Sequence, residues 1–350
     1  MTSSIKYVFN QVLTGVSNSE IKEDSYTIPG DTDAVNWLKN LRINQSLRLF
    51  PNFYSALVSC QCNEYLVLVN HQIDASAKIP PGLQEEELNP GSWVAIIYEL
   101  KLKIETTDVS LLEELLASDF ASNSGGYKEV PYDFEIDEVA FSLKLAFPRI
   151  DIYKVLPNSD FTDTRSLARL TGLVLTNSKQ NYLLTYETSV LEKFKTVFRK
   201  GSLKVNFENI LASYSASEYK FCYLDLYRCI ERVQPLLFFD NFHKHLCVGS
   251  STSCMTLEDF CMVFQDKTSL QPKLNDTFEK LIDSVWRLFT PKYSLLSKKY
   301  LYRLRNQIVH LRPGQTNSDM PKDDHEWNQL IEDMLVLVEH IYTQHDQLMN

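Results

Sequence analysis

The feature that most constrains this fold is a change in hydrophobic spacing that follows residues 213–217. Beyond that point, apolar residues recur at intervals of three and four, in segments at about 218–234, 274–289, 294–311 and 325–348. This spacing is typical of amphipathic α-helices, because about 3.6 residues complete a helical turn. We therefore predict an all-α domain at residues 213–350, built as a bundle of four to five helices, with Pro235 ending the first helix.

The first 212 residues show a different pattern. Short apolar runs rich in branched and aromatic residues fall between about residues 54 and 153, separated by turn-forming residues, and are typical of β-strands. Helical spacing also occurs in this region, at 111–120 and 189–198. We therefore predict a mixed α+β domain at residues 1–212. The clearest predicted strands are 65–69, 93–98 and 140–147.

Composition argues against several classes of protein. The formal net charge of -10 is opposite to that of a general nucleic-acid coat protein, so any RNA contact has to be local. The seven cysteines have no paired spacing, which favours reduced thiols and a cytoplasmic location. No secretory segment and no bilayer-length apolar run is found, so we expect no membrane partner. Signatures of nucleotide-binding loops and serine hydrolases are absent, and no cofactor is expected.

One cluster of metal-binding residue types offers an alternative. Two histidines and three cysteines lie within nineteen residues, but they contain no Cys-x-x-Cys pair. Cysteines seven residues apart also fit one face of a helix, so we expect no metal site, with zinc as the alternative. The cluster consists of His243, His245, Cys247, Cys254 and Cys261.

A short polar motif lies near the end of the third predicted helix. Residues 305–310 read Arg-Asn-Gln-Ile-Val-His. At 100° per residue, Asn306 and His310 fall opposite the apolar stripe, and the long side chain of Arg305 can reach them. A polar outer face is normal for an amphipathic helix, so a purely structural role stays open. The apolar stripe comprises Leu301, Leu304, Ile308 and Leu311, and the outer face comprises Lys299, Arg303, Asn306 and His310.

This motif is embedded in a strongly basic segment. Residues 284–312 contain seven Lys and Arg and no Asp or Glu, although the whole chain is acidic. Interleaved aromatic residues could stack on unpaired bases or pack in the core; they are Trp286, Tyr293, Tyr300 and Tyr302. We predict that local RNA binding involves Lys298, Lys299, Arg303 and Arg312.

The Arg305-Asn306 pair followed by His310 resembles the signature of the HEPN superfamily, helical bundles many of which cut RNA. The resemblance covers the predicted helical domain and nothing before it. It implies metal-independent cleavage, in which the ribose 2′-hydroxyl attacks its own phosphodiester and leaves a 2′,3′-cyclic phosphate. Arg305 would neutralise the phosphate, His310 would transfer a proton, and Asn306 would orient either group. Glu231 in the first helix would support Arg305; the alternative is an ordinary exposed glutamate.

The resemblance also implies partners and a biological role. Such nucleases commonly pair two bundles, because one motif supplies one histidine for two proton transfers, so we expect a homodimer through the C-terminal domain. Many family members are toxins or abortive-infection effectors. This implies antiphage defence by cleavage of tRNA or mRNA, with residues 1–212 sensing a phage or cellular trigger. The alternatives are a non-catalytic HEPN module that binds RNA, nucleotide or a partner protein, and an adaptor bundle whose motif is coincidental.

Overall fold

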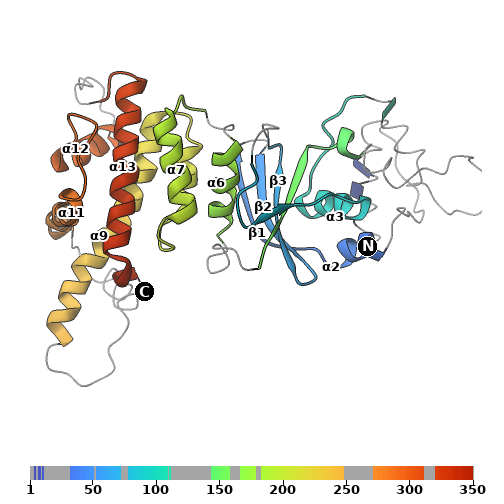
Figure 1. Cartoon of the computed structure of the whole chain (residues 1–350), viewed down its shortest axis with the longest axis horizontal. Helices are drawn as coiled ribbons and strands as arrows, with labels where there is room; N and C mark the ends of the chain where they lie inside the picture. Colours follow the sequence, from blue (N-terminus) through green and yellow to red (C-terminus); the bar gives the residue numbers. More distant parts are fainter. Residues whose placement is uncertain are drawn as a thin grey trace, which may run out of the picture. The chain divides into compact units, whose positions relative to one another are not determined.

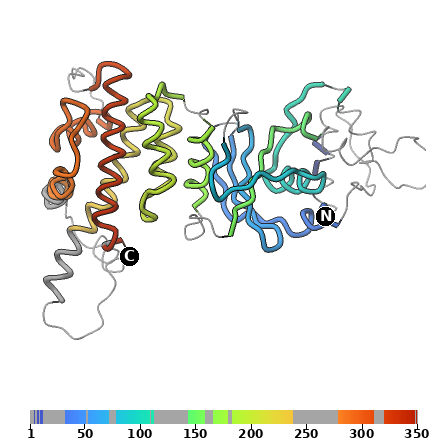
Figure 2. Tube along the Cα trace, in the orientation of Figure 1, coloured from blue at the N-terminus to red at the C-terminus, as the bar shows by residue number. Residues whose placement is uncertain are grey.

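The computed structural model divides the chain into two compact units, Met1–Thr171 and Gly172–Asn350. The sequence prediction placed this division after residue 212, so the helices just before that point belong to the second unit (Figures 1 and 2). The structure describes residues 4, 7–8, 10–11, 32–50, 53–71, 78–108, 110–111, 143–157, 166–178, 183–247, 271–310 and 320–349.

The first unit is built on a five-stranded antiparallel sheet with strand order β1-β2-β3-β5-β4. Val67 of β3 pairs with Ala56 of β2 on one side and with Ile152 of β5 on the other. These central strands are short and apolar, as expected for strands with a buried face. The strands are β1 (Arg42–Phe50), β2 (Phe53–Cys60), β3 (Asn63–Val69), β4 (Leu83–Glu85) and β5 (Ile150–Val155).

Two helices pack together in the first unit, α2 (Thr32–Asn40) and α3 (Pro90–Leu100). Both contribute to the core that buries Ala56 and Val67 of the sheet, and Figure 1 shows the two helices near each other. Gly91 makes their close approach possible, because a Cβ atom there would lie 2.3 Å from the carbonyl oxygen of Ala34.

Residues 93–98 form part of helix α3, so the predicted strand there is wrong. Asn89 caps the helix by accepting a hydrogen bond from the Ser92 amide, and Pro90 occupies the first turn. The apolar run is buried on all sides, and periodicity alone cannot separate a buried helix from a buried strand. The predicted strand at 140–147 is also wrong where it can be tested, because residues 143–146 are helical. The predicted strand at 65–69 is confirmed within β3.

The start of helix α6 (Leu167–Ser178) is linked to the sheet within the first unit. The buried hydroxyls of Ser55 and Thr171 lie 2.6 Å apart, and the Leu167 amide donates to the side-chain oxygen of Gln45 at 3.1 Å. These bonds satisfy polar groups that burial would otherwise leave unpaired.

The second unit is mostly helical, with α13 packed against α7, α9 and α11 (Figure 1). Apolar side chains of α13, including Leu330, Met334 and Val338, are fully buried and form the centre of its core. The helices after α6 are α7 (Thr188–Lys200), α8 (Phe207–Tyr214), α9 (Tyr219–Cys247), α11 (Gln271–Trp286), α12 (Lys298–Val309) and α13 (Asp324–Gln344), followed by the 3-10 turn η1 (Asp346–Met349).

All four helices predicted after residue 217 are present as α9, α11, α12 and α13, and the predicted helical segment 189–198 is part of α7. The expected end of the first helix at Pro235 is wrong, because α9 continues to Cys247. Proline removes one backbone hydrogen bond but does not forbid continuation of a helix. Most of the predicted helix at 111–120 lies outside the described residues. No helix in the described part of the chain is long and apolar enough to cross a membrane.

Candidate active site

Helix α12 holds the polar motif, and its inner face fixes its position in the second unit. Leu301, Leu304 and Ile308 are buried, as the helical spacing predicted. The N-terminus is capped by Ser297, whose hydroxyl accepts a hydrogen bond from the Tyr300 amide. Leu311 of the predicted stripe lies outside the described residues.

Helix α9 supports α12 through a buried hydrogen bond. The hydroxyl of Tyr223 donates to the carbonyl oxygen of Leu301 at 2.7 Å, and the Tyr223 side chain is fully buried. A buried bond of this kind locks the rotation of α12, because turning the helix would leave a buried hydroxyl unpaired. The packing of the inner face therefore determines which residues of α12 face outward.

The guanidinium of Arg305 is held between two polar side chains. Its Nη1 donates to Oδ1 of Asn306 at 3.0 Å, and its Nη2 lies 3.4 Å from Oε1 of Glu231 on α9. The Arg305 side chain is 29% exposed and that of Glu231 is 36% exposed. Arg305 is thus oriented by two neighbouring side chains at a partly exposed position.

Glu231 lies in a partly desolvated environment. Burial raises the pKa of its carboxyl group, while the positive charges of Arg305 and then Arg228 oppose that rise. Tyr227, one turn earlier on α9, is buried, and burial together with the Glu231 carboxylate raises the pKa of its hydroxyl. The Glu231–Arg305 contact is therefore an ion pair at a half-buried surface, where electrostatic interactions are stronger than in open solvent.

His310 occupies the C-terminal cap of α12. Its backbone amide donates to the carbonyl oxygen of Asn306 at 2.9 Å, so the two motif residues are separated by one helical turn. The side chain of His310 is exposed and that of Asn306 is half-buried. The motif thus combines an exposed imidazole with a guanidinium five residues earlier on the same helix, and imidazoles are common proton-transfer groups.

Carboxylates from other helices neutralise part of the basic segment. Lys298 forms an ion pair with Asp283 of α11, and Lys292 pairs with Glu332 of α13 at 2.7 Å. Sequence reasoning missed these contacts because the acidic partners lie outside the segment or far along the chain. Lys298, predicted to bind RNA, is therefore already paired within the protein.

Lys299 and Arg303 extend from the exposed outer face of α12, as predicted. Arg312 lies outside the described residues. Two of the four interleaved aromatic residues are core residues, because Tyr293 and Tyr300 are buried and their hydroxyls lie 3.2 Å apart. Trp286 is half-buried and Tyr302 is 42% exposed, which leaves Tyr302 as the most accessible ring of the four.

A buried aspartate that sequence reasoning missed positions the segment leading into α12. Asp333 of α13 is 2% exposed and accepts hydrogen bonds from the backbone amides of Lys292 and Tyr293 at 2.9–3.0 Å. Burial raises the pKa of this carboxyl, and the two backbone amides oppose the rise. The sequence signal for this contact was an acidic residue within an apolar helix. Such residues are seldom buried without hydrogen-bonding partners.

Metal-binding residues do not cluster in the described part of the chain, where no group of three or more His, Cys, Asp and Glu could hold an ion. The side chains of the alternative zinc cluster, His243, His245, Cys247, Cys254 and Cys261, lie outside the described residues.

Comparisons of the chain with protein-family models, with curated proteins and with solved structures gave no match.

Proposed function

We propose that the second unit is a metal-independent endoribonuclease of the HEPN type, with its active site on α12. The observation that carries the proposal is the placement of Arg305, oriented by its neighbour Asn306 and by Glu231, five residues before the exposed His310, which lies one helical turn after Asn306. A guanidinium with open donors binds phosphate, and an imidazole transfers protons near neutral pH.

In the proposed reaction, the ribose 2′-oxygen forms a bond to phosphorus while the bond from phosphorus to the 5′-oxygen breaks. A base takes the 2′-hydroxyl proton and an acid gives a proton to the leaving 5′-oxygen. Arg305 stabilises the negative charge that develops on the phosphate, and Asn306 orients the guanidinium. His310 serves as one of the two proton-transfer groups.

The second proton-transfer group comes, in this proposal, from the same motif of a second copy. Tyr302 and Val309 are exposed apolar residues seven positions apart, and Arg305 lies on the same face of α12 between them. Burial of these residues against a partner helix would bring two motifs together around a two-fold axis.

RNA contacts outside the reacting phosphate are assigned to Lys299 and Arg303, with Lys298 and Arg312 as further candidates. The RNA is tRNA or mRNA, and the biological role is that of an antiphage or toxin effector restrained by the first unit. Both this role and metal independence rest on the HEPN resemblance. The residues near the motif do not by themselves argue for metal independence, because they include carboxylates such as Glu231.

The proposal is tested by incubating the full-length protein and its variants with total RNA and with tRNA. Arg305→Ala and His310→Ala should each lower cleavage by at least about a hundredfold, which is typical of removing one catalytic group. The matched control is His325→Ala, an exposed histidine at the start of α13 whose ring is 2.6 Å from Glu187.

Full cleavage by both α12 variants would refute the assignment. RNA binding by the natural protein without any RNA cleavage would favour the alternative, a non-catalytic HEPN module. Absence of both binding and cleavage would favour an adaptor bundle.

A further inference from the structure

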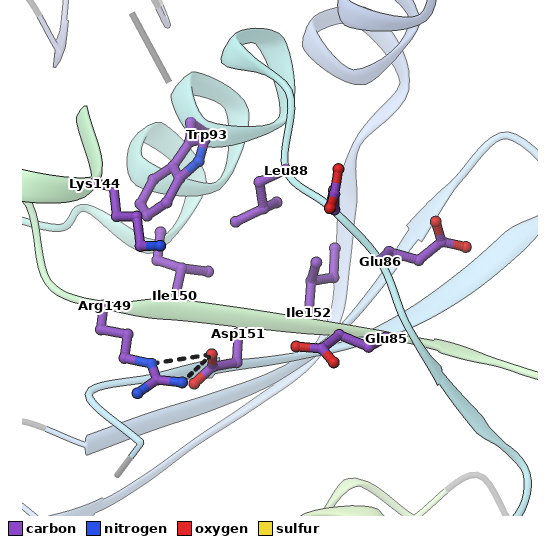
Figure 3. Close-up of a pocket in the computed structure, with 10 residues that line it drawn as sticks. Glu85, Glu86, Leu88, Trp93, Lys144, Arg149, Ile150, Asp151 and Ile152 are labelled. Atoms are coloured by element: carbon purple, nitrogen blue, oxygen red, sulfur yellow. Dashed lines mark hydrogen bonds and ion pairs between the residues drawn. The ribbon is translucent and has the colours of Figure 1, made fainter. Parts of the chain in front are cut away.

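The first unit contains a cavity of about 580 Å³ beside β5, and Figure 3 shows the side chains that line it. The most buried carboxylate in its wall is Asp151, whose Oδ1 accepts two hydrogen bonds from the Arg149 guanidinium. The other oxygen, Oδ2, faces Nδ1 of the buried His71 at 3.9 Å. Asp151 therefore offers no acceptor to a ligand, and we assign none to this cavity. Open hydrogen-bonding groups lie instead beside Arg305 in the second unit.

Three residues of α9 form a row that follows α12. Tyr223, Tyr227 and Glu231 are four positions apart, so they lie on one face of α9. Tyr223 donates to the carbonyl oxygen of Leu301 and Glu231 pairs with Arg305, so the row runs along α12 between these two contacts. Burial and then Glu231 raise the pKa of the Tyr227 hydroxyl, and Arg305 opposes that rise. The Tyr227 hydroxyl is therefore within electrostatic reach of both charged groups.

The Glu231 carboxylate and the Tyr227 hydroxyl have unused hydrogen-bonding capacity. Neither group forms a hydrogen bond with a described residue, since the contact between Glu231 and Arg305 at 3.4 Å is an ion pair. Neither group is among the fully enclosed side-chain atoms of the described residues that lack a hydrogen bond, so both retain access to solvent. Water already solvates such groups, so a ligand gains only where its own donors and acceptors match them.

The two groups match the edge of one RNA base. An ionised carboxylate accepts two adjacent hydrogen bonds, and a phenolic hydroxyl can donate one. Guanine presents two adjacent donors, N1–H and the 2-amino group, next to the acceptor O6. Adenine and cytosine place a ring acceptor beside one amino donor, and uracil holds one donor between two acceptors. Single-stranded RNA exposes these base edges for recognition by side chains.

We propose that Glu231 and Tyr227 bind the guanine base of a nucleotide next to the phosphate that Arg305 contacts. Glu231 accepts hydrogen bonds from N1–H and the 2-amino group, and Tyr227 donates to O6. The inference rests on the proposed function, since it names the base that the ribonuclease site prefers. Arg305 keeps its contact with Glu231, because a carboxylate has about four lone-pair positions and guanine occupies two of them.

The proposal is tested by fluorescence anisotropy of the full-length chain with labelled oligoadenylates whose central residue is guanosine, inosine or adenosine. The oligomers carry 2′-fluoro ribose throughout, which removes the attacking oxygen and prevents cleavage. The guanosine oligomer should bind at least about tenfold more tightly than the adenosine oligomer, because hydrogen bonds to an ionised acceptor are lost with adenine. Inosine lacks the 2-amino group, so its oligomer should have an intermediate affinity.

The outcomes separate this proposal from that of the nuclease. Equal affinity for guanosine and adenosine, or no binding of any oligomer, would overturn the guanine assignment. RNA cleavage that depends on Arg305 and His310 but shows no preference for guanosine would overturn it as well, while leaving the nuclease proposal in place. Guanosine-selective binding without any cleavage of natural RNA would support the base site and count against the nuclease.

Two variants locate the preference to these residues. Glu231→Gln should bring the ratio of guanosine to adenosine affinity to about one, because an amide replaces one acceptor by a donor. Tyr227→Phe keeps the ring and should weaken binding of guanosine and inosine, which share O6, about threefold, with no effect on adenosine. The matched control is Glu279→Gln, at an exposed glutamate of α11, which should leave the ratio unchanged.

The ratio also distinguishes base recognition from a purely orienting role of Glu231. If Glu231 only orients Arg305, Glu231→Gln should lower the affinity for all three oligomers together and leave the ratio as it is in the natural protein. A ratio unchanged by Glu231→Gln would therefore refute the assignment.

Discussion

Replacing Asp333 by alanine should destabilise the second unit and displace the start of α12. The carboxylate accepts hydrogen bonds from the backbone amides of Lys292 and Tyr293. Alanine would remove this acceptor from both amides in a region where Tyr293 is 2% exposed. A lost hydrogen bond to a charged group costs about 1.5–3 kcal/mol.

Two such bonds set the expected loss at about 3 kcal/mol, after allowance for partial relaxation and solvent entry. For a unit of this size that loss corresponds to a decrease in Tm of about 6–12 °C. Asp333→Asn keeps one acceptor oxygen, so it should lose about half as much free energy of unfolding.

The assay is urea unfolding of the full-length chain followed by far-ultraviolet circular dichroism, which reports mainly the helical second unit. Because two compact units can unfold separately, the transitions are fitted independently. The control is Asp283→Ala, which removes a surface ion pair with Lys298 and should cost less than about 1 kcal/mol. If Asp333→Ala were no more destabilising than this control, the reasoning about the two amides would be refuted.

Three further predictions concern other parts of the molecule. Glu231→Gln should reduce RNA cleavage at least about tenfold, because the Glu231–Arg305 pair orients Arg305. The free energy of unfolding should change by less than about 1 kcal/mol, because the pair is partly exposed. Unchanged cleavage would argue against that role of Glu231. Burial, and then Arg149, lowers the pKa of His71 from 6.5 to about 4, so the unfolded chain binds a proton first as the pH falls. Stability should therefore be lost from about pH 6.5 down to about pH 4, and His71→Gln should flatten this part of the urea-unfolding profile. Tyr302→Glu should convert a dimer to a 40.5 kDa monomer in light scattering and abolish cleavage, whereas a fully active natural monomer would contradict the shared site.

The helical part of the fold could be predicted from sequence because its signal is local. Each helix of the second unit carries apolar residues at three- and four-residue spacing, and Leu301, Leu304 and Ile308 are buried as that spacing requires. The run that begins at Trp93 gave no such signal, since an apolar segment buried on every side has no polar face. The capping residue Asn89 and the following Pro90 were the available clues to a helix.

The sequence predicted which residues of the candidate site are exposed, but it did not predict the ion pairs that neutralise part of the basic segment. The sequence placed His310 and Arg303 on an outer face, and both are exposed. It could not show that Lys298 is paired with Asp283, or that Asp333 fixes the segment before α12, because both contacts join separate helices. Contacts between distant parts of a chain depend on tertiary packing, which single-sequence patterns do not encode.

The most direct test of the proposed chemistry is to map the ends of RNA cut by the natural protein in excess EDTA. The motif on α12 supplies a guanidinium and an imidazole, so cleavage should persist and leave 2′,3′-cyclic phosphate and 5′-hydroxyl ends. RNA with deoxyribose at the cut site should resist, because the attacking oxygen is absent. Loss of activity in EDTA with rescue by Mg²⁺, ends bearing a 3′-hydroxyl, or efficient cutting of DNA would contradict a reaction carried by Arg305 and His310.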